Sequence, residues 1–215
     1  MKKIVLIGLI LAVAVMSGCA SYNTRGAMPI LNRVEEVKLI KAEKEGVIIT
    51  AFPIISESDS KKYFDENIID KRVLAVYTDV FNSTTSSIKL ISLNLKVGQK
   101  EEVVVASMTA DGMYKILKRE YSVKAFLWMF PTWFVGAPVS IAHTASVNSK
   151  IEEDIKEKQF QIGKEIRPKE TFQGFVWFRI PKEVIPEDND LPKGMALKLI
   201  LEKEKKLIEY NLPML

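Results

Sequence analysis

The chain has 215 residues, one cysteine, one histidine and a formal net charge of +4 at pH 7. This charge is too small for the basic footprint of a nucleic-acid binder, so we expect no nucleic-acid partner. A single cysteine excludes an internal disulfide, and the scarcity of cysteine and histidine argues against a zinc site, so we expect no metal and no cofactor.

The N-terminus has the parts of a secretory signal that ends at a cysteine. Two lysines precede the apolar run Ile4–Val15, and a small Ser-Gly pair completes residues 1–18, the predicted signal peptide. The next residue is Cys19, and the arrangement resembles the lipobox of bacterial lipoproteins, with Met16 where leucine is usual. The resemblance implies that Cys19 is acylated and that its lipid holds the protein to a bilayer. Ala20 follows instead of aspartate, which implies the outer membrane of the bacterial cell envelope, facing the periplasm.

Two other interpretations of the N-terminus stay open: an ordinary secretory signal followed by an unrelated cysteine, and a membrane-anchoring helix. The apolar run Ile4–Val15 is shorter than the roughly 20 residues that a spanning helix needs. Residues 19–33 are small and polar with little periodicity. We expect them to form a lipidated tether between the bilayer and the domain.

Residues 34–215 have the pattern of a β domain, because short stretches of apolar and polar alternation are separated by polar turns. The expected strands are Val34–Lys41, Gly46–Ile55, Arg72–Asn82, Ser87–Val97, Val103–Met108, Gly174–Ile180, Met195–Glu202 and Lys206–Asn211. Between the second and the third, Ser56 is expected to cap a short helix that ends at Phe64. Strands that do not alternate regularly with helices predict a mainly β fold, an antiparallel β-sandwich of immunoglobulin-like topology.

Two finer expectations follow from the strand pattern. The polar turn that starts at Asn82 is expected to join the strands 72–82 and 87–97 as a hairpin. The alternation also places both Val76 and Phe175 in the interior of the sandwich.

Residues 109–161 interrupt the strand pattern and are expected to form a helical apolar insertion. Helical spacing covers 110–121 and appears again over 147–155. Between them, residues 125–149 contain no Asp, Glu, Lys or Arg. Because strands precede and follow this stretch, a single membrane crossing would divide the sandwich. Pro131 and Gly136-Ala137-Pro138 also interrupt the helical pattern, so we expect a helical hairpin that turns near residues 136–138.

Three uses of the apolar stretch stay open: packing on the sandwich as a covered plug, contact with a bilayer or an apolar partner, and a true membrane span. Aromatic side chains favour interfaces where one edge is wet. The candidates for membrane or partner contact are therefore Phe126, Trp128, Met129, Phe130, Trp133 and Phe134.

Several short motifs together resemble a group of bacterial envelope lipoproteins of unknown function that carry an immunoglobulin-like β domain. The motifs are the lipobox, Leu74–Tyr77 with Phe81-Asn82, Asn148–Ile155, Ile166–Pro168 and Gly174–Phe178. They extend over most of the chain and are mostly structural. The resemblance implies the lipid anchor and the β domain, and it implies no catalytic residues.

The residues themselves do not indicate an enzyme either. His143 lies in the apolar stretch, where a packing role is typical, and the chain has neither a Gly-x-Ser-x-Gly elbow nor a glycine-rich phosphate loop. Residues 187–190 could ligate calcium, but the flanking prolines favour a solvated turn. We expect a lipid-anchored, extracytoplasmic structural or interaction protein of the envelope, with an envelope protein as partner. The alternative is a carrier or sensor of an apolar ligand that uses the aromatic insertion.

Overall fold

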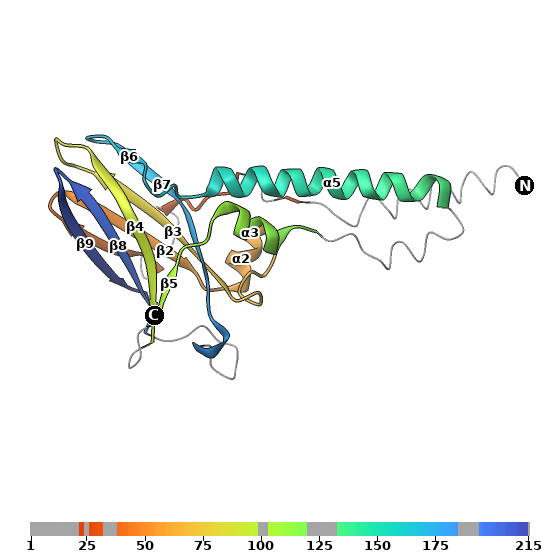
Figure 1. Cartoon of the computed structure of the whole chain (residues 1–215), viewed down its shortest axis with the longest axis horizontal. Coiled ribbons are helices and arrows are strands. Elements are labelled where there is room, and N and C mark those ends of the chain that lie inside the picture. Colours follow the sequence, from red (N-terminus) through yellow and green to blue (C-terminus); the bar gives the residue numbers. More distant parts are fainter. Residues whose placement is uncertain are drawn as a thin grey trace, which may run out of the picture.

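The computed structural model describes residues 22–23, 26–31, 38–98, 103–119, 133–184 and 194–214, and for residues 133–143 it describes only the backbone. Within these residues the chain forms two antiparallel β-sheets and three α-helices (Figure 1). The expected mainly β class is confirmed, and so is the expected antiparallel pairing of the strands.

The first sheet contains four strands in the order β1-β2-β3-β7. Their bounds are Ile40–Lys44 for β1, Val47–Ile54 for β2, Val73–Asn82 for β3 and Thr171–Arg179 for β7. A two-residue turn joins β1 to β2, and its residues Glu45 and Gly46 both have positive φ, at 52° and 78°. This conformation matches the right-handed twist of paired strands and sets the register of the hairpin.

The second sheet has the order β5-β4-β8-β9. Its strands are β4 (Ile88–Val97), β5 (Val103–Ala106), β8 (Ala196–Lys203) and β9 (Lys206–Pro213), and the short β6 (Glu165–Ile166) pairs with the start of β4. A short 3-10 helix (Lys182–Val184) follows β7. In β9 every second residue from Ile208 onward is buried. Such alternation is typical of a sheet that packs on a core with one face and meets solvent with the other.

The expected hairpin between residues 72–82 and 87–97 is wrong, because β3 belongs to the first sheet and β4 to the second. The contacts of Asn82 explain why the chain passes from the first sheet to the second at this turn. The Asn82 side chain is fully buried, and its amide donates to the carbonyl oxygens of Ser86 and Ile166 at 2.8 and 3.0 Å. Its Oδ1 accepts the backbone N–H of Thr84 at 3.1 Å. These bonds satisfy the polar groups of the turn locally, so the chain can pass from one sheet to the other without pairing the two strands.

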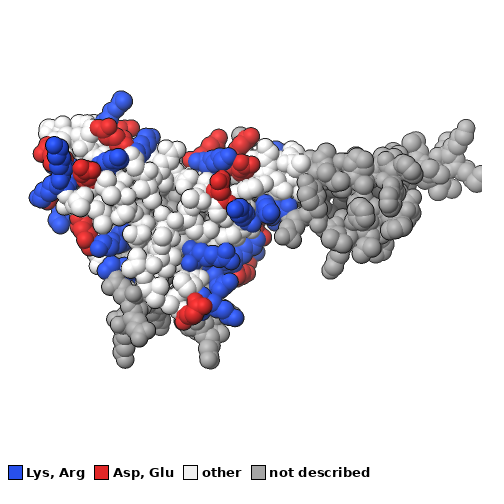
Figure 2. Space-filling view, in the orientation of Figure 1, with Lys and Arg blue, Asp and Glu red and all other residues white. Residues whose placement is uncertain are grey.

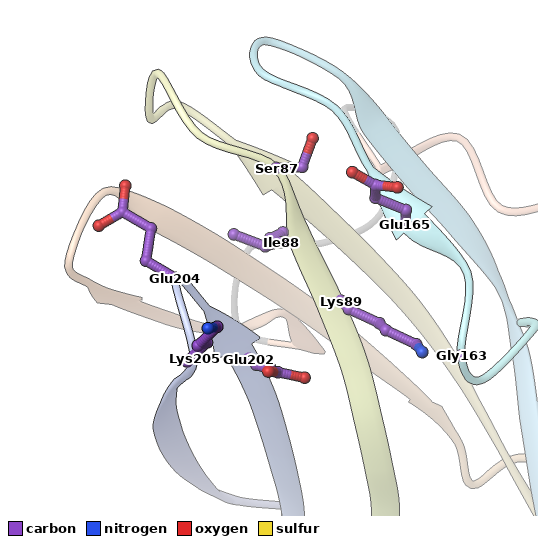
Figure 3. A pocket seen from close by; sticks show the side chains of 8 residues that line it. All are labelled: Ser87, Ile88, Lys89, Gly163, Glu165, Glu202, Glu204 and Lys205. Carbon is purple, nitrogen blue, oxygen red and sulfur yellow. The ribbon is translucent and has the colours of Figure 1, made fainter.

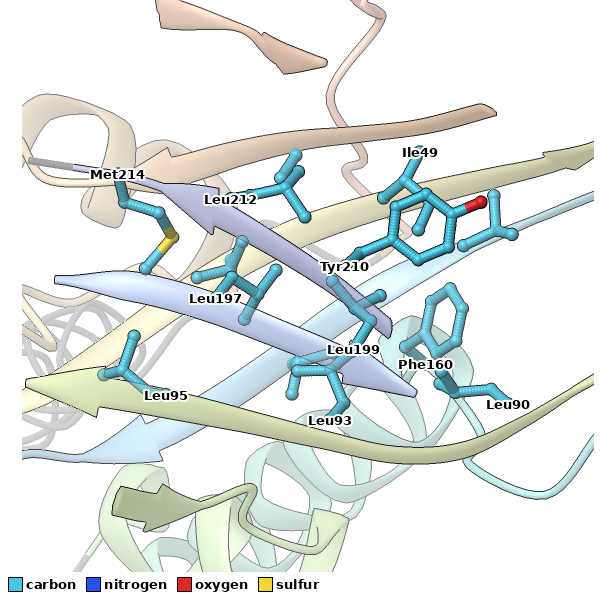
Figure 4. Close-up of a cluster of buried hydrophobic side chains, with 14 of the residues drawn as sticks. Ile49, Leu90, Leu93, Leu95, Phe160, Leu197, Leu199, Tyr210, Leu212 and Met214 are labelled. Carbon is cyan, nitrogen blue, oxygen red and sulfur yellow. The ribbon is translucent and has the colours of Figure 1, made fainter. Parts of the chain in front are cut away.

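Two hydrophobic cores lie on opposite faces of the first sheet. The sandwich core, between the two sheets, is mostly aliphatic, and Figure 4 shows part of it. The helical core lies between the first sheet and the helices and contains most of the buried rings: Tyr22, Phe52, Tyr63, Phe64, Tyr77, Phe175 and Trp177. Along β3, Leu74 and Val76 belong to the sandwich core, whereas Ala75 and Tyr77 belong to the helical core. The first sheet is therefore the middle of three layers.

Val76 lies in the sandwich core as expected, but the expectation for Phe175 is wrong, because its side chain lies in the helical core. The ring of Phe175 packs against Tyr63, Phe64 and Tyr77, with centroid distances of 5.8, 5.0 and 5.4 Å. The cause is that β7 is buried on both faces from Gly174 to Phe178. A strand buried on both sides has no polar face to mark its outside, so its alternation cannot assign the two faces.

The three helices are α2 (Glu57–Phe64), α3 (Ala110–Leu117) and α5 (Trp133–Lys158). The expected cap of α2 is confirmed, since the Ser56 hydroxyl accepts the backbone N–H of Asp59 at 3.0 Å. Thr109 caps α3 in the same way and accepts the N–H of Gly112 at 3.2 Å. The C-terminal part of α5 packs beside α3, and its N-terminal part points away from the sheets (Figure 1).

The expected turn near residues 136–138 is wrong, because α5 passes through them as a continuous helix. A proline inside a helix removes one backbone donor, and Pro138 does so close to the N-terminal end of α5. Helix propagation over the long run from Val139 to Lys158 compensates for this single missing bond.

The connection from β5 to α3 and the connection from α5 to β6 both pass along β7, the edge strand of the first sheet. The Met108 N–H donates to the carbonyl of Trp177 at 2.7 Å, and the Phe160 N–H donates to the carbonyl of Phe175 at 2.8 Å. The second approach is close, since a Cβ added at Gly174 would lie 2.7 Å from the Phe160 nitrogen. Only glycine leaves room for the passing backbone.

Candidate membrane-proximal site

The first described residues of the chain lie against the helical core. We call residues 22–23 and 26–31 the strap. Tyr22 is 8% exposed and belongs to the helical core, and Ala27, Met28 and Leu31 pack against that core. In the part that the structure describes, the region expected to be a tether is therefore packed on the domain.

Asp154 of α5 binds the strap at two points. The Tyr22 hydroxyl donates to Asp154 Oδ2 at 2.5 Å, and the Gly26 N–H donates to Asp154 Oδ1 at 2.6 Å. Hydrogen bonds to a charged acceptor are stronger than those between neutral groups. The two bonds fix the register of the strap on α5, because each uses a different carboxylate oxygen.

Lys158, one helical turn after Asp154, balances its charge. The Lys158 Nζ lies 2.6 Å from Asp154 Oδ2 and donates to the carbonyl of Tyr63 at 2.6 Å. The two side chains are 1% and 0% exposed. Burial lowers the pKa of Lys158, and its hydrogen bond with Asp154 opposes this shift. A buried pair of this kind adds little net stability, but removal of either partner leaves an uncompensated charge in the core.

A second polar contact joins the end of α3 to the middle of α5. The Arg119 N–H donates to Asn148 Oδ1 at 2.8 Å, and the Asn148 side-chain amide donates to the Arg119 carbonyl at 3.1 Å. The Arg119 guanidinium also lies 3.4 Å from Asp65 Oδ2, just after α2. Residues 119 and 148 are therefore held side by side on the folded domain.

The part of α5 before the buried Val147 forms a protrusion, which we define as residues 133–146. From Trp133 to Asn148 the helix rises about 22 Å at 1.5 Å per residue. Figure 1 shows this part of α5 pointing away from both sheets. On the sandwich, by contrast, Lys, Arg, Asp and Glu side chains are spread over the described surface (Figure 2). The protrusion and the sandwich thus differ in position and in the charge of their sequence.

The structure places only some of the predicted contact residues. Trp133 and Phe134 are the first two residues of α5, at the tip of the protrusion, and their backbone is described. The predicted lipidation site, Cys19, lies outside the described residues. So do Phe126, Trp128, Met129 and Phe130, and also the proposed turn at 187–190.

The described residues give two findings about membranes and metals. No helix among them is both long enough and apolar enough to cross a bilayer. No group of three or more His, Cys, Asp or Glu residues within the described ranges is arranged to hold a metal ion.

The surface hollows among the described residues include two that border the sandwich. The first lies between the start of β4, β6 and the β8–β9 turn (Figure 3), and it is lined by Ser87, Ile88, Lys89, Gly163, Glu165, Glu202, Glu204 and Lys205. The second lies beside β7 and is lined by Ser107, Met108, Thr109, Gln159, Phe160, Gln161, Ile162, Phe175 and Val176. Neither contains a strap residue, and the first combines charges of both signs in the manner of a solvated surface.

The docking of the strap was missed in the sequence, although one signal for it is present. The expected helix over 147–155 was identified from its apolar residues alone. Val147, Ile151, Asp154 and Lys158 follow each other at steps of four, three and four, the spacing of one helix face. A charged pair on the buried face of an amphipathic helix needs partners from elsewhere in the chain.

No protein-family model matches the chain, and no curated protein sequence matches it.

Proposed function

We propose that this protein is a lipid-anchored, extracytoplasmic component of the bacterial envelope that acts without catalysis, through structure or interaction, from the periplasmic face of the outer membrane. Its anchor would be the acylated Cys19. The resemblance to envelope lipoproteins of unknown function belongs to the same proposal.

The observation that carries the proposal is the docking of the strap on Asp154. Only three residue steps separate Cys19 from Tyr22, and three extended steps cover roughly 10 Å. A buried Tyr22 would therefore hold the helical layer close to the lipid, whereas a free tether over 19–33 would let the domain move away from it. This arrangement suits a protein whose task depends on its position at the membrane.

We also propose that the sandwich is immunoglobulin-like with its chain direction reversed. The constant-type immunoglobulin order is ABED in one sheet and CFG in the other. Without β1 and β6, the present sheets have the orders β2-β3-β7 and β5-β4-β8-β9. When β9 to β2 are lettered A to G from the C-terminus, these orders become GFC and DEBA. The neighbours are those of an immunoglobulin domain, which supports the comparison.

An interaction role has more support than the carrier alternative. The buried apolar side chains of α2, α3, α5 and the strap form one continuous cluster with the first sheet. Of the two hollows described above, the first is lined by charges of both signs, and the second is a surface hollow beside β7 that Phe175 and Met108 of this cluster line only in part. A carrier would need an apolar cavity that its ligand can enter.

Fatty-acid labelling tests the anchor. Cells that express the chain are fed a fatty acid with a clickable group, and the protein is followed by label and by membrane fractionation. Cys19→Ser should lose the label and should remain unprocessed or become soluble, because a hydroxyl does not replace the thiol in acylation. Tyr22→Phe is the matched control and should keep the label.

The same variants test the strap. Tyr22→Phe removes one hydrogen bond to Asp154, so trypsin should cut the purified protein after Arg25 faster than it cuts the wild type. The proposal fails if the wild-type protein carries no acyl chain by mass spectrometry while Cys19→Ser stays in the membrane after a high-salt wash.

A further inference from the structure

We propose that the first part of α5, residues 133–142, enters one leaflet of the bilayer that holds Cys19, as a re-entrant protrusion that does not cross. This inference rests on the proposed lipid anchor and adds the bilayer interior as a second partner of the same site. Four observations support it: the closed path of the chain, the length of α5, the charge pattern along α5 and the position of the strap.

The path of the chain is closed at the base of the protrusion. Arg119 and Asn148 are joined by two hydrogen bonds, of 2.8 and 3.1 Å, so whatever lies between them begins and ends at one place. The strands on either side also form one sheet, since Leu93 of β4 pairs with Leu199 of β8. A chain that starts and ends at the same point on one folded domain can enter a bilayer only by returning from the side it entered.

The length of α5 fits one leaflet. From Asp154, which binds the strap, to Trp133 the helix rises about 32 Å. The three residue steps before Tyr22 account for roughly 10 Å between the strap and Cys19 at the membrane surface. A helix directed toward that surface therefore extends well past it. Ten residues, 133–142, rise about 15 Å, which is half of a hydrocarbon core of about 30 Å.

The sequence of α5 changes at the position that this geometry requires. Residues 133–142 contain no ionisable side chain, and His143, Thr144, Ser146 and Asn148 follow. The first charged residue is Lys150, about 26 Å along the helix from Trp133. Lys150 and Glu153 are exposed. The apolar, polar and charged parts of α5 thus match hydrocarbon, headgroups and water in order.

The position of the anchor makes the bilayer a better partner for residues 133–142 than another protein would be. The lipid on Cys19 would place a membrane surface beside the base of the protrusion, and a buried strap leaves little chain for moving it away. An apolar helix tip in that position meets acyl chains before it meets a diffusing protein.

Single-tryptophan fluorescence tests the inference. The full chain is purified from membranes and reconstituted in vesicles of phosphatidylethanolamine and phosphatidylglycerol, with bromine atoms placed near the headgroup or near the methyl end of the acyl chains. Trp128→Phe with Trp177→Phe leaves Trp133 as the reporter. Bromine within the acyl chains should quench Trp133 by half or more, and it should quench strongly from the methyl-end position. Trp128→Phe with Trp133→Phe leaves Trp177, which is fully buried in the helical core and should not be quenched.

A pair of lysine substitutions sharpens the test in the Trp133 reporter. Ile141→Lys places a charge within the proposed hydrocarbon part and should reduce the quenching at least twofold. Ser149→Lys adds the same charge at an exposed position beyond it and should leave the quenching unchanged.

The outcomes separate this inference from the anchor. An acylated protein whose Trp133 is not quenched, or is quenched only by bromine near the headgroup, overturns the insertion and leaves the anchor intact. A protein without acyl chains whose Trp133 is quenched overturns the anchor and supports the insertion. Loss of vesicle binding together with loss of acylation overturns both.

Discussion

The sandwich core and the helical core share the first sheet, but different chemistry holds them together. The sandwich core is filled mainly by Val, Ile and Leu from both sheets. The helical core is built from aromatic rings and encloses the ion pair of Asp154 and Lys158. Aliphatic packing depends mainly on filled volume, whereas a buried ion pair depends on each of its hydrogen bonds. The helical layer is therefore the part whose structure depends on a few specific contacts, and the strap supplies two of them.

The largest effect is expected for Asp154→Ala, which breaks the ion pair and releases the strap. Removal of one partner of a buried pair costs about 3–5 kcal/mol. Urea unfolding should show this loss, and amide hydrogen exchange should rise in α5 while β8 stays protected. The double variant Asp154→Leu with Lys158→Met should recover part of the stability, because no unpaired charge then remains in the core. A single variant within about 1 kcal/mol of the wild type would contradict the importance of the pair.

Truncation of one residue in each core should have an equal or a smaller effect. Phe175→Ala in the helical core should cost about 3–5 kcal/mol, and Val76→Ala in the sandwich core should cost less because its side chain is smaller. Lys89→Ala, at an exposed position of β4, should change stability by less than about 0.5 kcal/mol. Near-ultraviolet circular dichroism should change for Phe175→Ala only, since Phe175 packs against three other rings. Equal costs for all three variants would contradict the assignment of the cores.

The smallest expected effect is a change in stability at alkaline pH. It comes from one buried tyrosine in each core. Burial raises the pKa of Tyr77, in the helical core, and of Tyr210, in the sandwich core, to about 12 from the ordinary value of 10.0. The unfolded chain therefore loses these protons first, and the stability they contribute should fall as the pH rises from about 10 to about 12. Tyr77→Phe and Tyr210→Phe should each flatten this decrease in denaturant titrations. An unchanged slope in both variants would contradict the raised pKa values.

The strands of the second sheet could be predicted with their buried faces, because one face of each is largely polar. β4, β8 and β9 pack on a single core, so their alternation marks the buried side. β7 is buried on both faces, and the face of Phe175 was assigned wrongly for that reason. The predicted hairpin after Asn82 failed because turn residues indicate that the chain reverses and not which sheet it joins.

The candidate site was less predictable, because its contacts are long-range. Tyr22 and Asp154 are 132 positions apart, and nothing in the local pattern around Tyr22 indicates burial. The turn expected near residues 136–138 rested on proline and glycine as helix breakers. That rule is weak for a long helix, in which one missing hydrogen bond is a small fraction of the total. The apolar stretch itself was visible, since the lack of charge over 125–149 needs no fold to be recognised.

The edge of β7 is covered by the segments that contain Met108 and Phe160. This affects how copies of the protein behave at high local concentration. An open edge strand offers unpaired amides and carbonyls to a neighbouring chain, and such pairing leads to aggregation. Lipid anchoring would confine the copies to a plane, where edges meet often. On β7, the connections through Met108 and Phe160 already occupy the carbonyls of Trp177 and Phe175. The segments that link the sandwich to its helices therefore also keep this edge from recruiting a second molecule.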